Sequence, residues 1–452
     1  MSASISRHGV AIDGAAHIPF RSHAVPMLQL FALTVMVIPS DTVIKAIGAQ
    51  GYAAALIGMF AFAAFLAATV LGLHDPLRYR HPIRSVLSVL WIFSLVSYIV
   101  MDHGSLTGAE AAAADRWLMQ LAVITGVALV AAECLTSLLD VRRVLRALSW
   151  GGAFCGVVAA LQFWINVDIA PYLRELPGFS VNFDNPSIVS RAALSRVTGT
   201  SITAIELGVV AGMLLPLAIY LAIYDTDRTA WKRWAPVPLI GVAIPSSVSR
   251  SGIISVALAV AVLMVLMPPR QRLIALCAAP LAVTGVFMSA HGLIGTLTTF
   301  FGAGTNDDSV QARVFDYPEV ERLVEQAPWF GHGGGTYLPD YPMYILDNQY
   351  LKTAIELGLV GVIALAAYFL VPCIAALVAR RHSGNPELRL LCAALAGAAL
   401  AATVCSLTFD SLSFPMFSNV YGLVIGLIGA CWRLAMAEGR PRQGSYRGGQ
   451  VT

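Results

Sequence analysis

The sequence predicts an all-α protein that crosses a membrane many times. Charged residues make up only 12% of the 452 residues and hydrophobic residues 57%, whereas soluble domains average about 25% charged and roughly 45–50% apolar residues. Apolar stretches near the length that crosses about 30 Å of hydrocarbon recur along the chain. This composition excludes an ordinary soluble enzyme, and we expect the lipid bilayer, and no nucleic acid, as a partner.

Hydropathy places twelve membrane spans, and an even number puts both termini on the same side. Spans one to nine fill residues 25–290 and the last three fill 349–436, between an N-terminal segment 1–24, a large loop 291–348 and a tail 437–452. The spans are residues 25–44, 52–73, 84–101, 117–136, 144–165, 202–223, 235–249, 251–268, 272–290, 349–379, 387–407 and 416–436.

The distribution of Lys and Arg predicts which side of the membrane holds the termini. Every loop on the side of the termini is basic, and such loops stay in the cytoplasm. We therefore predict a multi-pass membrane protein with both termini cytoplasmic. The seventh span is short and contains Pro238 and Pro245, but a re-entrant segment there would place basic residues on the wrong side, so two true crossings are favoured.

The cysteines and the N-terminus suggest no additional chemistry. All seven cysteines fall in or beside apolar runs, which is typical of small packing residues, and neither a disulfide framework nor metal-ligand spacing is visible. Residues 1–24 lack the pattern of a cleaved signal peptide.

Two long loops lie on the side opposite the termini, at about residues 166–201 and 291–348. Loops of this length are often functional. The second contains an amphipathic stretch at residues 309–326, which predicts a surface helix. Pro318 lies inside that stretch and would kink or split the helix.

Four arginines on this side are candidate ligands for a diphosphate: Arg191, Arg196, Arg250 and Arg313. The planar guanidinium donates two parallel hydrogen bonds to phosphate and stays charged. Each could instead be an anchor that reaches the lipid headgroups. Arg250 is the strongest candidate, because it lies in the tight hairpin "SSVSRSG", where its small neighbours would let a ligand approach.

The stretch "ILDNQYLKTAIELGLVG" carries charges into the tenth span. Asp347 lies where a helix N-cap is expected, while Asn348, Lys352 and Glu356 are spaced by four and share one helix face. Glu356 lies deep enough to cost about 2.5–3.5 kcal/mol if it faced lipid. We therefore expect Glu356 to point into the bundle, with Asp347 either a cap or part of a site.

The stretch "WFGHGGGTY" matches no nucleotide-binding motif, so we expect a sharp turn there. His332 within it is a candidate base or hydrogen-bond donor. Four tyrosines near the end of the large loop could line a sugar path or form an interfacial aromatic belt; they are Tyr337, Tyr341, Tyr344 and Tyr350.

These motifs, in this order, resemble the O-antigen ligase and polysaccharide polymerase superfamily of bacterial inner membranes. The matching pieces are "IPSDTVI", "RVTGTSITAIELG", "SSVSRSG", "ARVFDYPEVERLVEQAPWFGHGGGTY" and "DNQYLKTAIELGLVG". The resemblance implies the architecture of C-type glycosyltransferases and an inverting transfer from undecaprenyl diphosphate that uses no metal and no cofactor. It also implies that Arg196 and Arg250 bind the diphosphate, with Arg313 as a further candidate.

One departure from the family bears on function. O-antigen ligases carry a His near the end of the large loop as the proposed base, whereas this chain has Asp347, as in polymerases of exopolysaccharide repeat units. The base is then Asp347 or His332, with Asn348, Tyr350 and Glu356 in support.

The expected function is that of a polymerase. It would transfer lipid-linked oligosaccharide repeat units to an acceptor glycan and so build exopolysaccharide or O-antigen. The alternatives are a ligase acting on lipid A core or another acceptor, and a flippase. A flippase and a chain-length regulator are candidate partners.

Overall fold

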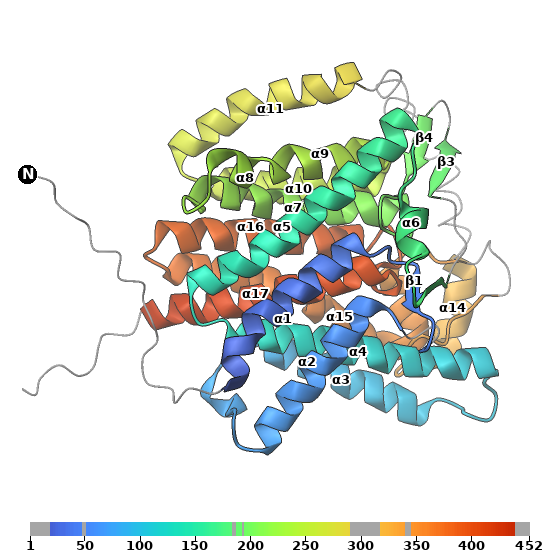
Figure 1. Ribbon diagram of the computed structural model, residues 1–452. Coiled ribbons are helices and arrows are strands. Elements are labelled where there is room, and N and C mark those ends of the chain that lie inside the picture. Colours follow the sequence, from blue (N-terminus) through green and yellow to red (C-terminus); the bar gives the residue numbers. More distant parts are fainter. Residues whose placement is uncertain are drawn as a thin grey trace, which may run out of the picture.

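The computed structural model describes residues 19–47, 51–182, 187–191, 194–289, 317–339 and 345–438. Long helices run side by side in one bundle (Figure 1), which confirms the all-α polytopic membrane fold. Within the described residues, twelve helices occupy the positions of the predicted spans: α1 (Pro19–Val37), α2 (Ala53–Val70), α3 (Pro82–Val100), α4 (Gly108–Cys134), α5 (Leu138–Ala160), α7 (Ala204–Tyr224), α9 (Pro236–Ser246), α10 (Arg250–Leu266), α11 (Pro269–Ser289), α15 (Gln349–His382), α16 (Pro386–Cys405) and α17 (Pro415–Glu438).

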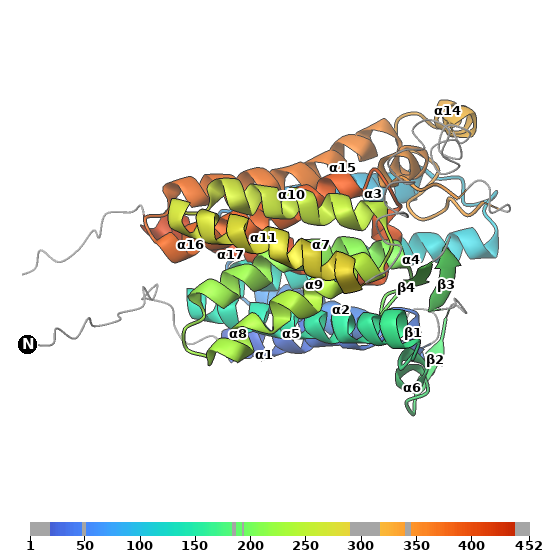
Figure 2. The ribbon, with the colours of Figure 1, turned by 90° about the horizontal axis from the view of Figure 1, so that it is seen from above.

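The bundle has two different ends (Figure 2). At the α8 end, α1 begins, α17 ends and the short helix α8 (Ala230–Trp234) lies. At the α14 end lie four short strands and the helices α6 (Ala170–Arg174) and α14 (Tyr317–Gln326). Both long loops of the sequence analysis contribute to the α14 end, as predicted. The part of the predicted surface helix before Tyr317, residues 309–316, lies outside the described residues.

Eight of the described helices are long and apolar enough to cross a membrane, namely α2, α3, α4, α5 with its extension to Ile165, α7, α15, α16 and α17; α1 and α10 add shorter apolar stretches. The predicted end of the first span was wrong. α1 stops at Val37, and residues 42–44 form a strand, because Pro39 cannot continue the helix and Thr, Val and Ile favour an extended chain.

The strands fasten loops to the α14 end. β1 (Thr42–Ile44) pairs antiparallel with β2 (Phe179–Val181), and β3 (Ile188–Arg191) pairs antiparallel with β4 (Leu194–Val197). Arg174 supports the first pair, since its Nη2 lies 2.7 Å from Oδ2 of the buried Asp41. The loop between α5 and α7 is therefore joined to the loop between α1 and α2.

At the α8 end, a buried acid collects basic side chains from three segments. Oε2 of Glu133 lies 2.5 Å from His74 Nε2, and Oε1 lies 3.1 Å from His81 Nε2 and also contacts Arg84. Arg433 donates to the Glu133 carbonyl at 2.7 Å. This cluster holds α4 against the α2–α3 connection and α17, and it pairs a charge that would be costly to bury alone.

Small residues set the distances between helices. A Cβ added at Gly156 of α5 would lie 1.8 Å from the carbonyl oxygen of Leu239 in α9. The backbones of the two helices therefore meet directly, as small residues allow in membrane bundles.

We expect Gly156→Ala to destabilise the protein by about 1–3 kcal/mol, the range typical of overpacked cores. The matched control is Gly241→Ala on α9, where an added Cβ meets nothing within 4 Å. Both changes raise helix propensity by about 1 kcal/mol, so the difference isolates the contact. Thermal unfolding in detergent measures it, and equal melting temperatures for the two variants would contradict the direct backbone contact.

Candidate functional site

Among the described helices, α7, α10, α15 and α17 each begin at the α14 end (Figure 2). A helix start carries partial positive charge and unpaired N–H groups, so this end favours an anion. Side chains cap the starts of three of them, with Thr203 on α7, Ser249 on α10 and Asn348 on α15. The electrostatics of this end therefore suit the phosphate ligand predicted for the arginines.

Arg250 is the first residue of α10 and follows a turn of three residues after α9. Val248 in that turn has φ of 44°, a left-handed conformation that costs a β-branched residue on the order of 1–3 kcal/mol and that clusters at functional sites. Val248 is buried and Arg250 half-buried. The turn thus fixes the guanidinium-bearing residue at the helix start.

The small neighbours of Arg250 have a different role from the one predicted. Gly252 faces α7, where an added Cβ would lie 2.8 Å from the Cα of Gly208. Ser251 accepts a hydrogen bond from Thr408 Oγ1 at 2.8 Å. These residues bring helices together, so the expectation that they leave space for a ligand was wrong.

Arg196 lies on β4, opposite Val189 of β3. β4 contacts α9, and the chain continues from β4 into α7. In the second turn of α7, Gly208 meets Gly252 of α10. Arg196 and Arg250 therefore lie on elements that both contact α9 at the same end of the bundle.

The turn after α16, residues 406–414, joins the starts of α10 and α15. On one side, Cys405 Sγ donates to the Ser251 carbonyl at 3.4 Å. On the other side, the Gln349 N–H donates to Ser406 O at 2.9 Å, and the Leu412 N–H donates to Gln349 Oε1 at 2.8 Å. Ser251 follows Arg250 and Gln349 follows Asn348, so the first residues of both helices are held by one turn.

Asn348, and not Asp347, caps α15. Its Oδ1 accepts the N–H groups of Tyr350 at 2.9 Å and Leu351 at 3.3 Å. Asp347 precedes the cap and is exposed. The prediction that Asp347 occupies the N-cap was wrong by one residue.

α15 is broken at Gly358, which has φ of 68°. The glycine-rich segment fills the break: the N–H groups of His332 and Gly333 donate to Ile355 O at 3.0 Å and Glu356 O at 2.9 Å, and the Leu359 N–H donates to Pro328 O at 2.9 Å. A Cβ at Gly358 would lie 2.4 Å from the backbone of Trp329. The segment turns sharply, as predicted, and serves the backbone of α15.

His332 and Glu356 both anchor this segment. His332 Nε2 donates to the carbonyl of Leu323 in α14 at 2.9 Å, so the imidazole holds the surface helix. Glu356 is buried and its carboxylate faces the N–H groups of Gly335 and Tyr337. Glu356 points into the bundle, as predicted, and its partner is the loop.

From α15, Lys352 contacts the turn after α16, and Tyr350 contacts α16 itself. Lys352 Nζ lies 3.4 Å from Asp410 Oδ2 and donates to Ser413 Oγ at 2.7 Å. The Tyr350 hydroxyl donates to Thr403 O at 3.2 Å. These contacts support the start of α15, the role assigned to this helix face from the sequence.

Some predicted residues cannot be placed. The backbone of Arg191 pairs with Leu194 in the β3–β4 hairpin, but its side chain, Arg313, Tyr341 and Tyr344 lie outside the described part of the structure. Arg196, Arg250 and Asp347 are the predicted residues that the structure brings to one end at the surface, and we call them the α14-end site.

Glu206 and Asp410 are two acids near the site that escaped the sequence analysis. Glu206, fully buried, accepts the N–H groups of Ile202 and Phe417, each at 3.0 Å, and so joins the starts of α7 and α17. Asp410 forms an ion pair with Lys352. Glu206 lies three residues after Thr203, a capping spacing that could have marked it, whereas no local signal identifies the partner of Asp410.

Comparison with known proteins connects this geometry to a family. Residues 235–366 match the family described as O-antigen ligase, and no curated protein matches the chain. The matched stretch runs from the start of α9 through Arg250, the large loop and Asp347, and past the break in α15. The part of the chain that carries the α9–α10 hairpin, the large loop and the start of α15 is therefore similar to the O-antigen ligase family, as its ordered motifs predict.

Proposed function

We propose that this protein polymerises undecaprenyl-diphosphate-linked oligosaccharide repeat units into exopolysaccharide or O-antigen. The match to the O-antigen ligase family supports a role in polysaccharide assembly at a membrane. The observation that carries the proposal is the turn at residues 406–414: Thr408 donates to Ser251, the residue after Arg250, and Ser406 O accepts the N–H of Gln349, two residues after Asp347. The elements that bear a candidate diphosphate ligand and a candidate base are thus held by the same turn.

The chemistry divides between these residues. The anomeric carbon of the donor is bonded to an oxygen of the diphosphate, and an acceptor hydroxyl attacks that carbon as this bond breaks. Asp347 takes the hydroxyl proton as general base. Arg250 and Arg196 stabilise the negative charge that develops on the leaving diphosphate, the kind of electrostatic effect that dominates many enzymes. Direct displacement inverts the anomeric centre, and no nucleotide is required.

The proposed orientation places the α14 end in the periplasm. The clusters at the α8 end contain arginines from near the starts of α3 and α5, including Arg84, Arg142 and Arg146. Basic loops remain cytoplasmic, so both termini of this inner-membrane protein would lie in the cytoplasm. Lipid-linked repeat units would then reach the site from the outer leaflet.

A ligase is the second candidate, because the matched family is described by that activity. Both reactions break the same sugar–phosphate bond and differ in the acceptor. The exposed Asp347 in the position of the ligase histidine favours polymerisation.

We expect Arg250→Ala to abolish polymer formation while the protein remains in the membrane, since removing one group that stabilises a developing anion costs roughly 10²–10³-fold in rate. The matched control is Arg322→Ala, an exposed arginine of α14 whose partner is Glu319 three residues earlier. Both are assayed with purified protein and a lipid-linked repeat unit. Polymer from Arg250→Ala at the rate of Arg322→Ala would exclude Arg250 from the diphosphate site.

We expect Asp347→Asn to slow polymerisation by about 10²–10⁴-fold, as loss of a general base does, and to impair it far more than His332→Ala. Asn348→Asp, which preserves capping, controls for changes at the helix start. Rates are compared at equal amounts of folded protein. A greater loss in His332→Ala than in Asp347→Asn would assign the base to His332.

A further inference from the structure

A cleft of about 650 Å³ opens at the α8 end, far from the α14-end site. Its walls come from α1, α5, α7 and α8. Leu30 and Leu33 on α1 and Trp150 on α5 give one part an apolar lining, while Arg228, Lys232 and Arg233 lie at and beside α8. The lining therefore has an apolar part and a cationic part.

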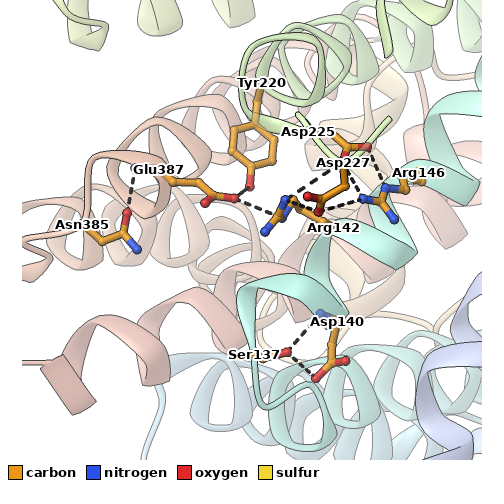
Figure 3. A network of polar contacts seen from close by, with 9 residues as sticks. All are labelled: Ser137, Asp140, Arg142, Arg146, Tyr220, Asp225, Asp227, Asn385 and Glu387. Carbon is orange, nitrogen blue, oxygen red and sulfur yellow. Dashed lines mark hydrogen bonds and ion pairs between the residues drawn. The ribbon is translucent and has the colours of Figure 1, made fainter. Parts of the chain in front are cut away.

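Arg146 and Asp225, which line the cleft, belong to a network of ion pairs and hydrogen bonds (Figure 3). Arg146 Nε donates to Asp225 Oδ2 at 2.7 Å, and Arg142 lies 3.3 Å from Asp227 and 3.1 Å from Glu387. The Tyr220 hydroxyl donates to Glu387 at 3.0 Å. This network ties α5 to α7 and α16, and its arginines are engaged with its own acids.

The cations around α8 are not engaged in this way. Within the described part of the chain, Arg228, Lys232 and Arg233 make no ion pair, and the Nε of Arg233 is buried without a hydrogen-bond partner. Ser149, which lines the cleft and is only 1% exposed, also has an unpartnered Oγ among the described residues. Buried polar atoms normally have a partner, and a polar group bound in the cleft would supply one.

The aromatic residues place the cleft at the level of lipid headgroups. Trp231 and Trp234 of α8 are exposed, and Trp150 of α5 meets Trp231 edge to face with ring centres 6.4 Å apart. Exposed tryptophans mark the membrane–water interface. Cations beside them lie at the depth of lipid phosphates, whereas Leu30 and Leu33 offer an exposed apolar surface suited to acyl chains.

We propose that this cleft binds an anionic phospholipid, with its phosphate against Lys232 and Arg233 and its acyl chains along Leu30, Leu33 and Trp150. Basic sites between membrane helices bind such headgroups through charge. The cleft adds an apolar wall, which a soluble anion would not use. The proposal is independent of the reaction at the α14 end.

The test is native mass spectrometry of the delipidated full chain titrated with phosphatidylglycerol or phosphatidylcholine. We expect one tightly retained phosphatidylglycerol and a clear preference over phosphatidylcholine. Each Lys or Arg near an anionic lipid contributes on the order of fivefold in affinity, so Lys232→Gln with Arg233→Gln should weaken binding about 25-fold. The control is Arg270→Gln, which changes an exposed cation in the first turn of α11, outside the cleft lining; this variant should bind like the unmodified protein.

A second variant tests the apolar wall. Leu33→Trp fills the cleft without altering a charge and should also displace the lipid. If Leu33→Trp binds the lipid unchanged, the apolar wall takes no part and only surface charge attracts the lipid. If the double variant binds the lipid unchanged, Lys232 and Arg233 do not contact its phosphate. Either result overturns the proposal, as does inorganic phosphate that competes with phosphatidylglycerol at equal concentration.

Discussion

The break in α15 at Gly358 is the constraint on which the α14 end depends. Hydrocarbon offers no water to backbone groups, so a broken helix persists in a membrane only where protein satisfies the freed N–H and C=O groups. Here the segment from Pro328 to Gly333 does so from the large loop. In the same segment, His332 donates a hydrogen bond to the carbonyl of Leu323 in α14. The carboxylate of Glu356 faces the N–H groups of Gly335 and Tyr337, which follow the segment. The break in α15 thereby fixes this part of the large loop against the bundle.

This arrangement explains how a loop residue can be positioned for chemistry. Asp347 lies between the large loop and α15, and Asn348 and Gln349 fix the helix start that follows it. The turn at residues 406–414 then relates this start to α10 and hence to Arg250. Side chains on rigid elements hold geometry better than side chains on free loops. The proposed base and the proposed diphosphate ligand therefore share one rigid support.

Much of the fold could be predicted from the sequence because hydropathy follows the bilayer closely. The positions of the twelve helices and the orientation of Glu356 into the bundle could both be predicted in this way. The identity of the cap was harder, because Asp and Asn are equally good caps and only the backbone conformation distinguishes Asp347 from Asn348. The break at Gly358 gave no signal, since one glycine in an apolar run resembles any packing glycine. The role of Gly252 was missed because its partner, Gly208, lies on another helix.

The central claim is that the α14 end joins repeat units, and glycan analysis of a deletion strain tests it most directly. With the gene removed, lipid-linked glycans are extracted and sized, and complementation with the unmodified gene should restore the original pattern. If the protein is the polymerase, single repeat units should accumulate on undecaprenyl diphosphate in the deletion strain. Long chains that accumulate on the lipid would contradict it, because polymerisation would then have proceeded without this protein and the missing step would be ligation.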